Sequence, residues 1–191
     1  KTWHEPWTAY KDDNAVLPDE EQLTYLKEGY TKIDFQFPDL EGNLVSPSDP
    51  RFENKVLVLQ LFGTWCPNCM DETKFLSDWY NKNKQRGVEI LGLAYETKDD
   101  YEYAKSRVMK MKKKLGVNYN YVIAGTKDKE AASKTLPMLN EISAFPTFII
   151  IDKKGEVRKI HTGFKGPGTG VHYELFTQSF NATMDQLLNE Q

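Results

Sequence analysis

The sequence predicts an α/β protein with a central mixed sheet flanked by helices, and three observations lead to this fold class. Short apolar runs typical of buried strands alternate along the chain with segments that have helical spacing. Near the end, two apolar runs flank the turn Lys153-Lys154-Gly155-Glu156, which predicts an antiparallel hairpin. A chain of 191 residues, 39% of them hydrophobic, can bury one sizeable core.

The individual elements follow from periodicity and from turn residues. The central strand, 56–62, is an unbroken apolar run apart from Gln60, which suits a parallel strand buried on both faces. Gly87 and Gly116 follow two of the helical segments and predict their ends. The predicted strands are 34–39, 41–45, 56–62, 88–94, 119–124, 147–152 and 157–160. The predicted helices are 70–85, 99–115, 127–139 with a break near Pro137, and 172–189.

The first part of the chain differs from the rest, so we predict an N-terminal extension or linker over residues 1–32 and an α/β domain over residues 33–191. The first 17 residues are rich in aromatic and polar side chains without a clear period. Pro18 and the acidic residues after it predict a short helix that reaches Gly29. Two interpretations of the extension remain: a segment packed on the domain, or a linker that binds a partner.

The charge and hydropathy of the chain give no indication of a nucleic-acid partner or of a membrane-spanning segment. A net charge of −3 gives no reason to expect a nucleic acid. No stretch approaches the roughly 20 apolar residues that span a membrane, so no transmembrane segment is expected in this chain. Because the chain begins at Lys1, a signal peptide, a lipid anchor or an upstream domain would not be visible in it.

The two cysteines of the chain form the motif Trp65-Cys66-Pro67-Asn68-Cys69, at the point where the central strand gives way to a helix. This position puts the first sulfur at a helix N-terminus, where unpaired N–H groups and the helix dipole favour a thiolate. Cys69 follows one turn later, close enough to form a short disulfide with Cys66. We interpret the pair as a redox-active dithiol. The restriction of cysteine to the motif also suits an oxidising compartment.

Two other interpretations of the cysteines stay open. A structural zinc site needs four ligands, and the chain has no second pair of cysteine or histidine residues at short spacing. We therefore expect no metal site, and we expect His161 and His172 at the surface rather than as ligands. The cysteines could also be inert core residues.

Taken together, the motifs resemble the thioredoxin superfamily, and within it the TlpA/ResA-type thiol-disulfide oxidoreductases with an AhpC/TSA-Redoxin-like domain. The similarity covers about residues 33–190. The additional helix and strand at 99–124 resemble the insertion that marks this branch. The stretches that carry the resemblance are 39–46 (DLEGNLVS), 65–69 (WCPNC), 145–147 (FPT) and 152–157 (DKKGEV). The resemblance implies a thioredoxin-like fold with an N-terminal extension and a central helix–strand insertion.

The resemblance also assigns roles to the two cysteines. Cys66 would be the exposed thiolate that attacks a substrate disulfide, and Cys69 the buried thiol that resolves the mixed disulfide. This order agrees with the greater influence of the helix dipole on Cys66. The Cys66–Cys69 disulfide would be the redox group, with no other cofactor.

By the same resemblance, Pro146 would be a cis-proline that faces the dithiol. The family pairs the backbone beside this proline with an extended substrate peptide, which makes Phe145 and Thr147 candidate substrate contacts. Phe145 departs from the smaller residues often found there, so substrate contacts can differ. Trp65 is expected to cover the dithiol and to shield the start of the helix.

Glu72 is the candidate proton acceptor. Thioredoxins proper carry a buried carboxylate five residues before the tryptophan of the motif, and that position is Gln60 here, which cannot act as a base. The TlpA/ResA branch has a glutamate three residues after the second cysteine, and Glu72 occupies that place. It lies one turn from Cys69 on the same helix face and could accept its proton. The alternative is a solvated carboxylate of the first helical turn, the interpretation we favour for Asp71.

Pro67 and Asn68 lie between the cysteines and help to set the reduction potential. Asn68 lacks the charge of the histidine common in strong oxidants, whereas Pro67 is less common in reductants than glycine. The direction of electron flow therefore stays open between a disulfide reductase and a thiol oxidase or isomerase.

The leading hypothesis is an enzyme of redox homeostasis that reduces protein disulfides in the bacterial cell envelope, for example the periplasm, with electrons from a membrane donor. A peroxidase is disfavoured because the Thr-x-x-Cys motif of peroxiredoxins is absent: Thr64 stands two residues before Cys66. A non-catalytic module that binds Cu(I) or a protein partner is the alternative from another class, since thiolates suit Cu(I). Copper chaperones of this fold, however, use a longer cysteine spacing.

Overall fold

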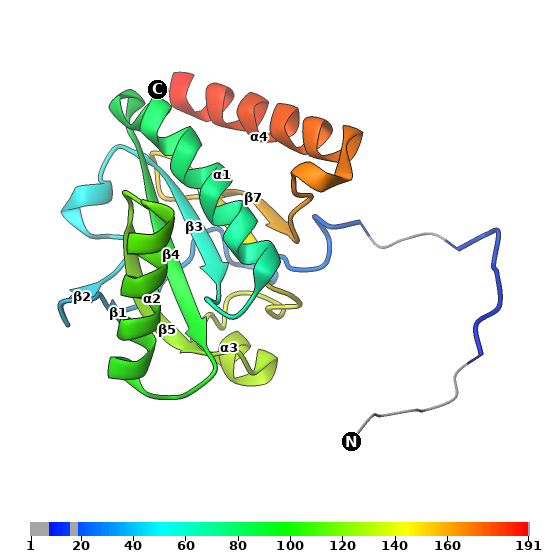
Figure 1. Ribbon diagram of the computed structural model, residues 1–191. Coiled ribbons are helices and arrows are strands. Elements are labelled where there is room, and N and C mark those ends of the chain that lie inside the picture. The colour runs from blue at the N-terminus through cyan, green and yellow to red at the C-terminus, as the bar shows by residue number, and fades with distance from the viewer. Residues whose placement is uncertain (1–7, 16–18, 191) are drawn as a thin grey trace.

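The computed structural model describes residues 8–15 and 19–190, and its centre is a five-stranded sheet in the order β5-β4-β3-β6-β7 (Figure 1). The central strand β3 pairs with β4 in parallel and with β6 in antiparallel orientation. β5 extends the parallel half and β7 the antiparallel half, so the sheet is mixed, as the sequence predicted. The strands are β3 (Val56–Phe62), β4 (Val88–Glu96), β5 (Asn120–Thr126), β6 (Thr147–Ile151) and β7 (Val157–Thr162).

Helices cover the sheet and connect its strands. Two short strands pair as a hairpin before the sheet begins, and three 3₁₀ turns complete the described elements. The helices are α1 (Pro67–Asn83), α2 (Tyr101–Leu115), α3 (Lys129–Thr135) and α4 (Val171–Asn189). The hairpin strands are β1 (Phe37–Pro38) and β2 (Leu44–Val45), and the 3₁₀ turns are η1 (Pro50–Phe52), η2 (Lys84–Arg86) and η3 (Pro167–Thr169). α2 and β5 form the helix–strand insertion that the resemblance implied.

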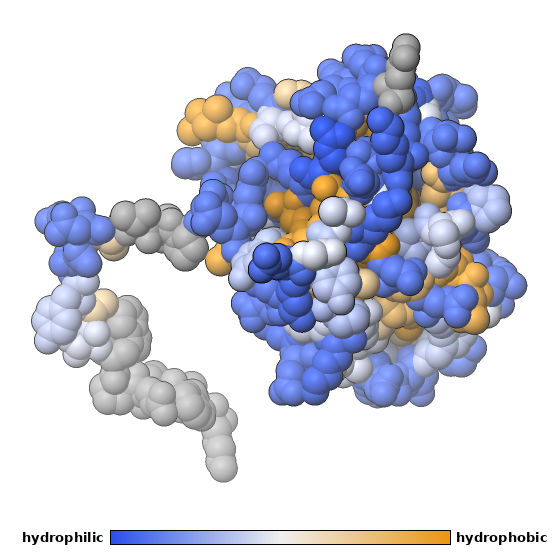
Figure 2. Space-filling view, turned by 180° about the vertical axis from the view of Figure 1, so that it is seen from behind, coloured by the Kyte–Doolittle hydropathy of each residue, from blue (hydrophilic) through white to orange (hydrophobic). Residues whose placement is uncertain are grey.

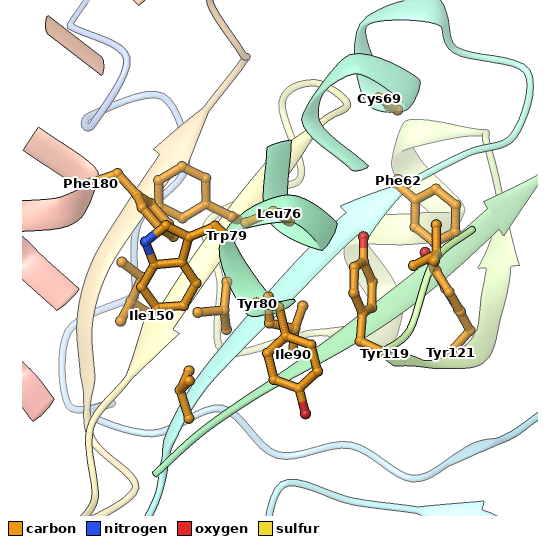
Figure 3. Packing of buried hydrophobic residues seen from close by; sticks show 14 of the residues in the cluster. Phe62, Cys69, Leu76, Trp79, Tyr80, Ile90, Tyr119, Tyr121, Ile150 and Phe180 are labelled. Carbon is orange, nitrogen blue, oxygen red and sulfur yellow. The ribbon is translucent and has the colours of Figure 1, made fainter. Parts of the chain in front are cut away.

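The sheet separates two hydrophobic clusters. On one face, α1, α2 and α4 pack against the strands, α2 through residues such as Val108. Figure 3 shows Leu76 of α1 and Phe180 of α4 in this cluster. On the other face, α3 and the chain before β3 cover residues such as Leu59 and Leu93. Seen from behind, hydrophilic side chains cover most of the surface, and apolar side chains are visible among them in patches (Figure 2).

Helix α1 begins three residues earlier than its apolar periodicity predicted. Pro67 takes the first helical position, where its missing N–H costs no hydrogen bond, and Cys66 is the N-cap. The end of α1 lies close to the predicted position: a 3₁₀ turn follows the helix, and Gly87 ends this turn in the left-handed conformation (φ 84°). α3 ends at Thr135, since the residue before Pro137 is disfavoured in helical conformation.

The short helix predicted from Pro18 to Gly29 is wrong over the described residues. Pro18 itself lies outside them, and residues 19–29 form turns and one extended bridge. Leu26 pairs with Leu139, and Asn140 binds Tyr25 through both its backbone and its side chain. Tertiary pairing of the backbone therefore overrides the local helix signal. Residues 8–15 lie apart from the rest of the molecule in Figure 1.

Candidate active site

The dithiol lies at the carboxyl end of β3, where the turn over residues 63–65 leads into α1. Cys66 closes this turn through its N–H, which donates to the Gly63 carbonyl at 3.1 Å. As the N-cap of α1, Cys66 accepts the Cys69 N–H on its sulfur at 3.3 Å. A sulfur in this position receives the positive end of the helix dipole. Both cysteines are present as free thiols.

The two thiols differ in environment. Cys69 is completely buried, and Cys66 is 7% exposed. Cys66 is thus the more accessible sulfur, but the prediction that it is exposed overstates its access. A hydrogen bond from the Cys69 thiol, helped by the backbone N–H groups of Cys69 and Asn68, lowers the pKa of Cys66 to about 6 against the effect of burial. Burial, followed by the interaction with Cys66, raises the pKa of Cys69 far above its usual range.

A loop from the other half of the sheet faces Cys66. The Phe145–Pro146 peptide bond is cis, as the resemblance implied. The Cys66 thiol points at the Phe145 carbonyl at 3.8 Å. Pro146 is buried, and its carbonyl accepts the Gly163 N–H at 2.8 Å. Thr147 is fully buried, donates its hydroxyl to Ala144 and pairs in the sheet with Leu61 and Thr162, so its contact with a substrate stays a prediction.

Trp65 forms one wall beside the dithiol. Its indole N–H donates to the Tyr95 carbonyl at 2.8 Å, and its ring meets the Phe145 ring edge-on at 5.9 Å. A β-carbon on Gly63 would come within 2.1 Å of Trp65 Nε1, so only glycine leaves room for the indole. Trp65 remains 36% exposed, and Pro67 and Asn68 are exposed beside it. These residues therefore form a surface that a substrate can touch.

Glu96, at the end of β4, holds the turn that carries the motif. Its carboxylate is completely buried and accepts the Thr64 N–H at 2.8 Å and the Thr64 hydroxyl at 3.0 Å. Sequence reasoning missed this residue. A charged side chain at the end of an apolar run was the available signal, but only the pairing of β4 with β3 brings it to the motif.

Glu72 is completely buried on the face of α1 that carries Cys69. Burial raises the pKa of Glu72 to about 8, and a hydrogen bond from Gln60 opposes that rise. The Gln60 amide nitrogen lies 2.9 Å from Glu72 Oε2, whereas Oε1 has no hydrogen-bond partner among the described residues. The neighbouring Asp71 is exposed and pairs with Lys74, in keeping with its interpretation as a surface residue.

Two further residues belong to this buried polar group. Gln60 also reaches the Thr73 hydroxyl at 3.1 Å, and the Tyr119 hydroxyl donates to Gln60 Oε1 at 2.8 Å. In Figure 3, Tyr119 and Tyr121 lie side by side, and the Tyr119 hydroxyl points toward the turn of α1 that carries Cys69. Gln60 was visible in the sequence as the one polar residue of its strand, but its partners were not.

The described residues contain no group of three or more histidine, cysteine or acidic side chains placed to hold a metal ion. The expectation that His161 lies at the surface is wrong. It is 9% exposed, and its ring stacks on Phe148 at 5.2 Å. The expectation failed because β7 turns this side chain under α4, where Phe176 also contacts it.

The chemistry available here is thiol–disulfide exchange: an N-capping thiol of low pKa, a buried partner thiol and a cis-proline loop facing them. Solved structures share the fold of this chain. A thioredoxin family thiol:disulfide interchange protein from Chlorobium tepidum has a TM-score of 0.60 at 19% identity, covering 83% of this chain and 96% of its own. A thiol-disulfide oxidoreductase from Bacteroides fragilis has a TM-score of 0.54 at 25% identity, covering 76% and 99%.

Sequence comparisons give the family. The Redoxin family model matches residues 27–172. The thiol-disulfide oxidoreductase ResA of Geobacillus kaustophilus is 31% identical over 74% of this chain and 73% of its own length. ResA of Bacillus subtilis is 28% identical over 81% and 76%. The chain therefore belongs to the Redoxin family of the thioredoxin superfamily and is an oxidoreductase of the TlpA/ResA type.

Proposed function

We propose that this oxidoreductase reduces disulfides of proteins in the bacterial cell envelope and that Cys66 is its attacking residue. The difference between the two thiols carries the proposal. At neutral pH a thiol with a pKa of about 6 is mostly thiolate, whereas the buried Cys69 keeps its proton. Only Cys66 is then ready to attack.

The reaction is a two-step exchange. The Cys66 thiolate attacks one sulfur of the substrate disulfide, and the other substrate sulfur leaves as a thiolate. Cys69 then passes its proton to the ionised form of Glu72, which grows as the pH approaches the Glu72 pKa of about 8. The Cys69 thiolate attacks the Cys66 sulfur, which breaks the mixed disulfide and releases the second substrate thiolate. Two electrons move from the dithiol to the substrate. The enzyme is left with a Cys66–Cys69 disulfide, which a dithiol donor in the membrane must reduce again.

The surroundings of the dithiol suit an extended protein segment as substrate. The backbone beside Pro146 and the exposed side chains of Trp65, Pro67 and Asn68 provide its contacts. No cofactor besides the dithiol takes part. The envelope location rests on the resemblance to TlpA/ResA-type proteins. Within the described residues, no helix has the length and apolar character needed to cross a membrane.

The opposite direction, thiol oxidation, is the second candidate. A lower pKa of the attacking thiol stabilises the reduced enzyme and makes it more oxidising. This pKa is about 7 in a reducing thioredoxin and about 3.5 in a strongly oxidising relative. The value of about 6 for Cys66 lies nearer the reducing end, which favours the reductase.

Equilibration of the purified protein with glutathione or dithiothreitol buffers measures the potential of the Cys66–Cys69 couple. A potential near or below about −270 mV supports reduction, and one near about −120 mV supports oxidation or isomerisation. The absence of any reversible disulfide would remove the redox function altogether and favour a binding module. Copper bound by the reduced protein, and lost in Cys66→Ser, would identify that module as a Cu(I) site.

A further inference from the structure

Gln60 stands at the centre of a buried polar chain beneath the dithiol. It is completely buried in the middle of β3, between Leu59 and Leu61. A buried amide must satisfy two N–H groups and a carbonyl without water. Its nitrogen contacts Glu72 and Thr73, and its oxygen accepts from Tyr119. This series of hydrogen bonds thus links Tyr119, at the start of β5, to α1, the helix that carries the motif.

The Tyr119 hydroxyl decides which way the Gln60 amide faces. An amide turned by 180° would place its oxygen against the Glu72 carboxylate, so that two acceptors met. The same turn would place its N–H groups against the hydrogen that Tyr119 now donates to Oε1. With Glu72 ionised, the observed orientation lets the amide donate to the carboxylate and accept from Tyr119, whereas the turned one would leave the carboxylate without its donor and would require the Tyr119 hydroxyl to rotate and accept instead.

Gln60 is also the only side chain that donates a hydrogen bond to Glu72 among the described residues. The ionisable groups that act on this carboxyl are Cys66 and Cys69 from α1 and Tyr119 from the edge of β5, and none of them is a cation. The negative charge on Glu72 is therefore stabilised by one amide. Within the described part of the chain, Glu72 Oε1 has no hydrogen-bond partner.

We propose that Gln60 and Tyr119 are positioning residues for Glu72: Tyr119 holds the Gln60 amide, the amide holds Glu72 Oε2, and Oε1 is left free to accept a proton. This inference rests on the proposed function, in which that proton comes from Cys69. Thioredoxins have a carboxylate on the central strand, at the position of Gln60. In this protein the carboxylate is Glu72 on the helix, and Gln60 donates a hydrogen bond to it. The helix–strand insertion takes part because Tyr119 leads into β5.

Tyr119→Phe tests the inference with little structural disturbance, because the ring keeps its packing against Tyr121 and Tyr80. Tyr121→Phe is a matched control: this neighbouring ring is also buried, and its hydroxyl acts on the Tyr119 hydroxyl but makes no hydrogen bond to Gln60 or Glu72 in the described structure. The readout is the pKa of Glu72 in the reduced protein, followed by carbon NMR of ¹³C-labelled glutamate side chains. Glu72→Gln identifies the signal.

Tyr119→Phe should raise the pKa of Glu72 by about 0.5–1 unit, since the amide is no longer held with its N–H groups toward the carboxylate. Gln60→Leu, which removes the donor, should raise it by about 1–2 units. Tyr121→Phe should leave it within about 0.2 units of the parent value, below the effect of one hydrogen bond. Equal pKa values in Tyr119→Phe and Tyr121→Phe would overturn the inference, whether or not Gln60→Leu folds.

The pH dependence of disulfide exchange tests the proposed role of Glu72 independently of this inference. If Glu72→Gln leaves the pH dependence of disulfide exchange unchanged, Glu72 is not the proton acceptor of Cys69. The NMR result for Tyr119→Phe would still decide whether Gln60 and Tyr119 position the carboxyl. If both roles hold, the rate of the resolving step in Tyr119→Phe reaches its maximum at a higher pH than in the parent protein, and the difference equals the shift of the Glu72 pKa.

Discussion

The thiol of Cys66 faces the backbone carbonyl of Phe145 at 3.8 Å, so the attacking sulfur and the cis-proline loop are in direct contact in the reduced protein. The two residues come from opposite halves of the sheet, one after β3 and the other before β6. This contact covers Cys66 and leaves it 7% exposed. A substrate disulfide that reaches the sulfur must therefore also meet the Phe145–Pro146 backbone.

The Cys66 thiol should titrate near pH 6, and Cys69→Ala should raise its pKa, because the Cys69 thiol is the largest cause of the lowering. Thiolate absorbance at 240 nm, or the rate of alkylation by iodoacetamide between pH 4 and 10, measures this value. Cys66→Ser is the control and should lose the low-pH titration. An unchanged pKa in Cys69→Ala would assign the lowering to the helix N-terminus alone.

Glu72→Gln should stabilise the reduced protein by an amount that grows with pH. In the folded protein Glu72 holds its proton to a pH of about 8, whereas in the unfolded chain it loses it near 4.5. Between these values the unfolded state binds fewer protons, so this carboxyl makes the protein less stable as pH rises. The substitution removes that loss, which amounts to about 1.4 kcal/mol per pH unit at most.

Urea denaturation of parent and Glu72→Gln proteins at several pH values between 5 and 8 measures this difference. Cys66 acts in the opposite sense between about pH 6 and 9; it is present in both proteins, so the difference between them contains Glu72 and its interaction with Cys66 but not the titration of Cys66 by itself. Asp71→Asn, at the exposed neighbouring position, should leave the slope unchanged. A difference that does not depend on pH would contradict the burial of an ionisable Glu72.

Glu96→Ala should destabilise the protein by about 2–4 kcal/mol, because the Thr64 N–H and hydroxyl both lose their acceptor. The freed turn would also move Trp65, and disulfide exchange should slow by at least about tenfold. Chemical denaturation and exchange kinetics measure the two effects. Glu96→Gln retains an acceptor and should lie much closer to the parent; equal losses in both variants would count against the hydrogen bonds.

The contacts of Thr24 predict that the segment before residue 33 stabilises the domain. Thr24 is completely buried; its oxygen lies 3.0 Å from the Ser143 hydroxyl and accepts the Ser143 N–H at 3.3 Å. Thr24→Val should cost about 1–3 kcal/mol in the free energy of unfolding, because that N–H loses its partner. Thr31→Val, with an exposed side chain, is the control. The boundary at residue 32 stays a prediction.

Local sequence patterns account for most of the fold. The apolar runs and the glycines at helix ends predicted every strand of the sheet and the four helices, with boundaries displaced by a few residues. The helix predicted before Gly29 failed because the pairing of Leu26 with Leu139 joins positions more than a hundred residues apart, which no local pattern reports. The burial of His161 was missed because it depends on the packing of α4 over β7, which the local pattern around residue 161 does not report.

The candidate site was predictable where its residues adjoin the cysteines. Trp65, Pro67, Asn68 and Glu72 could be proposed from spacing within one motif and from the resemblance. Glu96 and Tyr119 reach the site across neighbouring strands, so they become visible only when the sheet is assembled. Gln60 was noticed in the sequence only as a residue unable to act as a base. Its position as a hydrogen-bond donor depends on the packing of α1 against β3.

Trapping of a mixed disulfide tests the assignment of the two cysteines most directly. Reduced Cys69→Ser and Cys66→Ser proteins would be incubated with glutathione disulfide at pH 7 and followed by mass spectrometry. We expect Cys69→Ser to accumulate a stable glutathione adduct on Cys66, at a rate at least about tenfold above that of Cys66→Ser, because only Cys66 is largely ionised at this pH. Equal rates, or faster modification of Cys69, would contradict the assignment of Cys66 as the attacking thiolate.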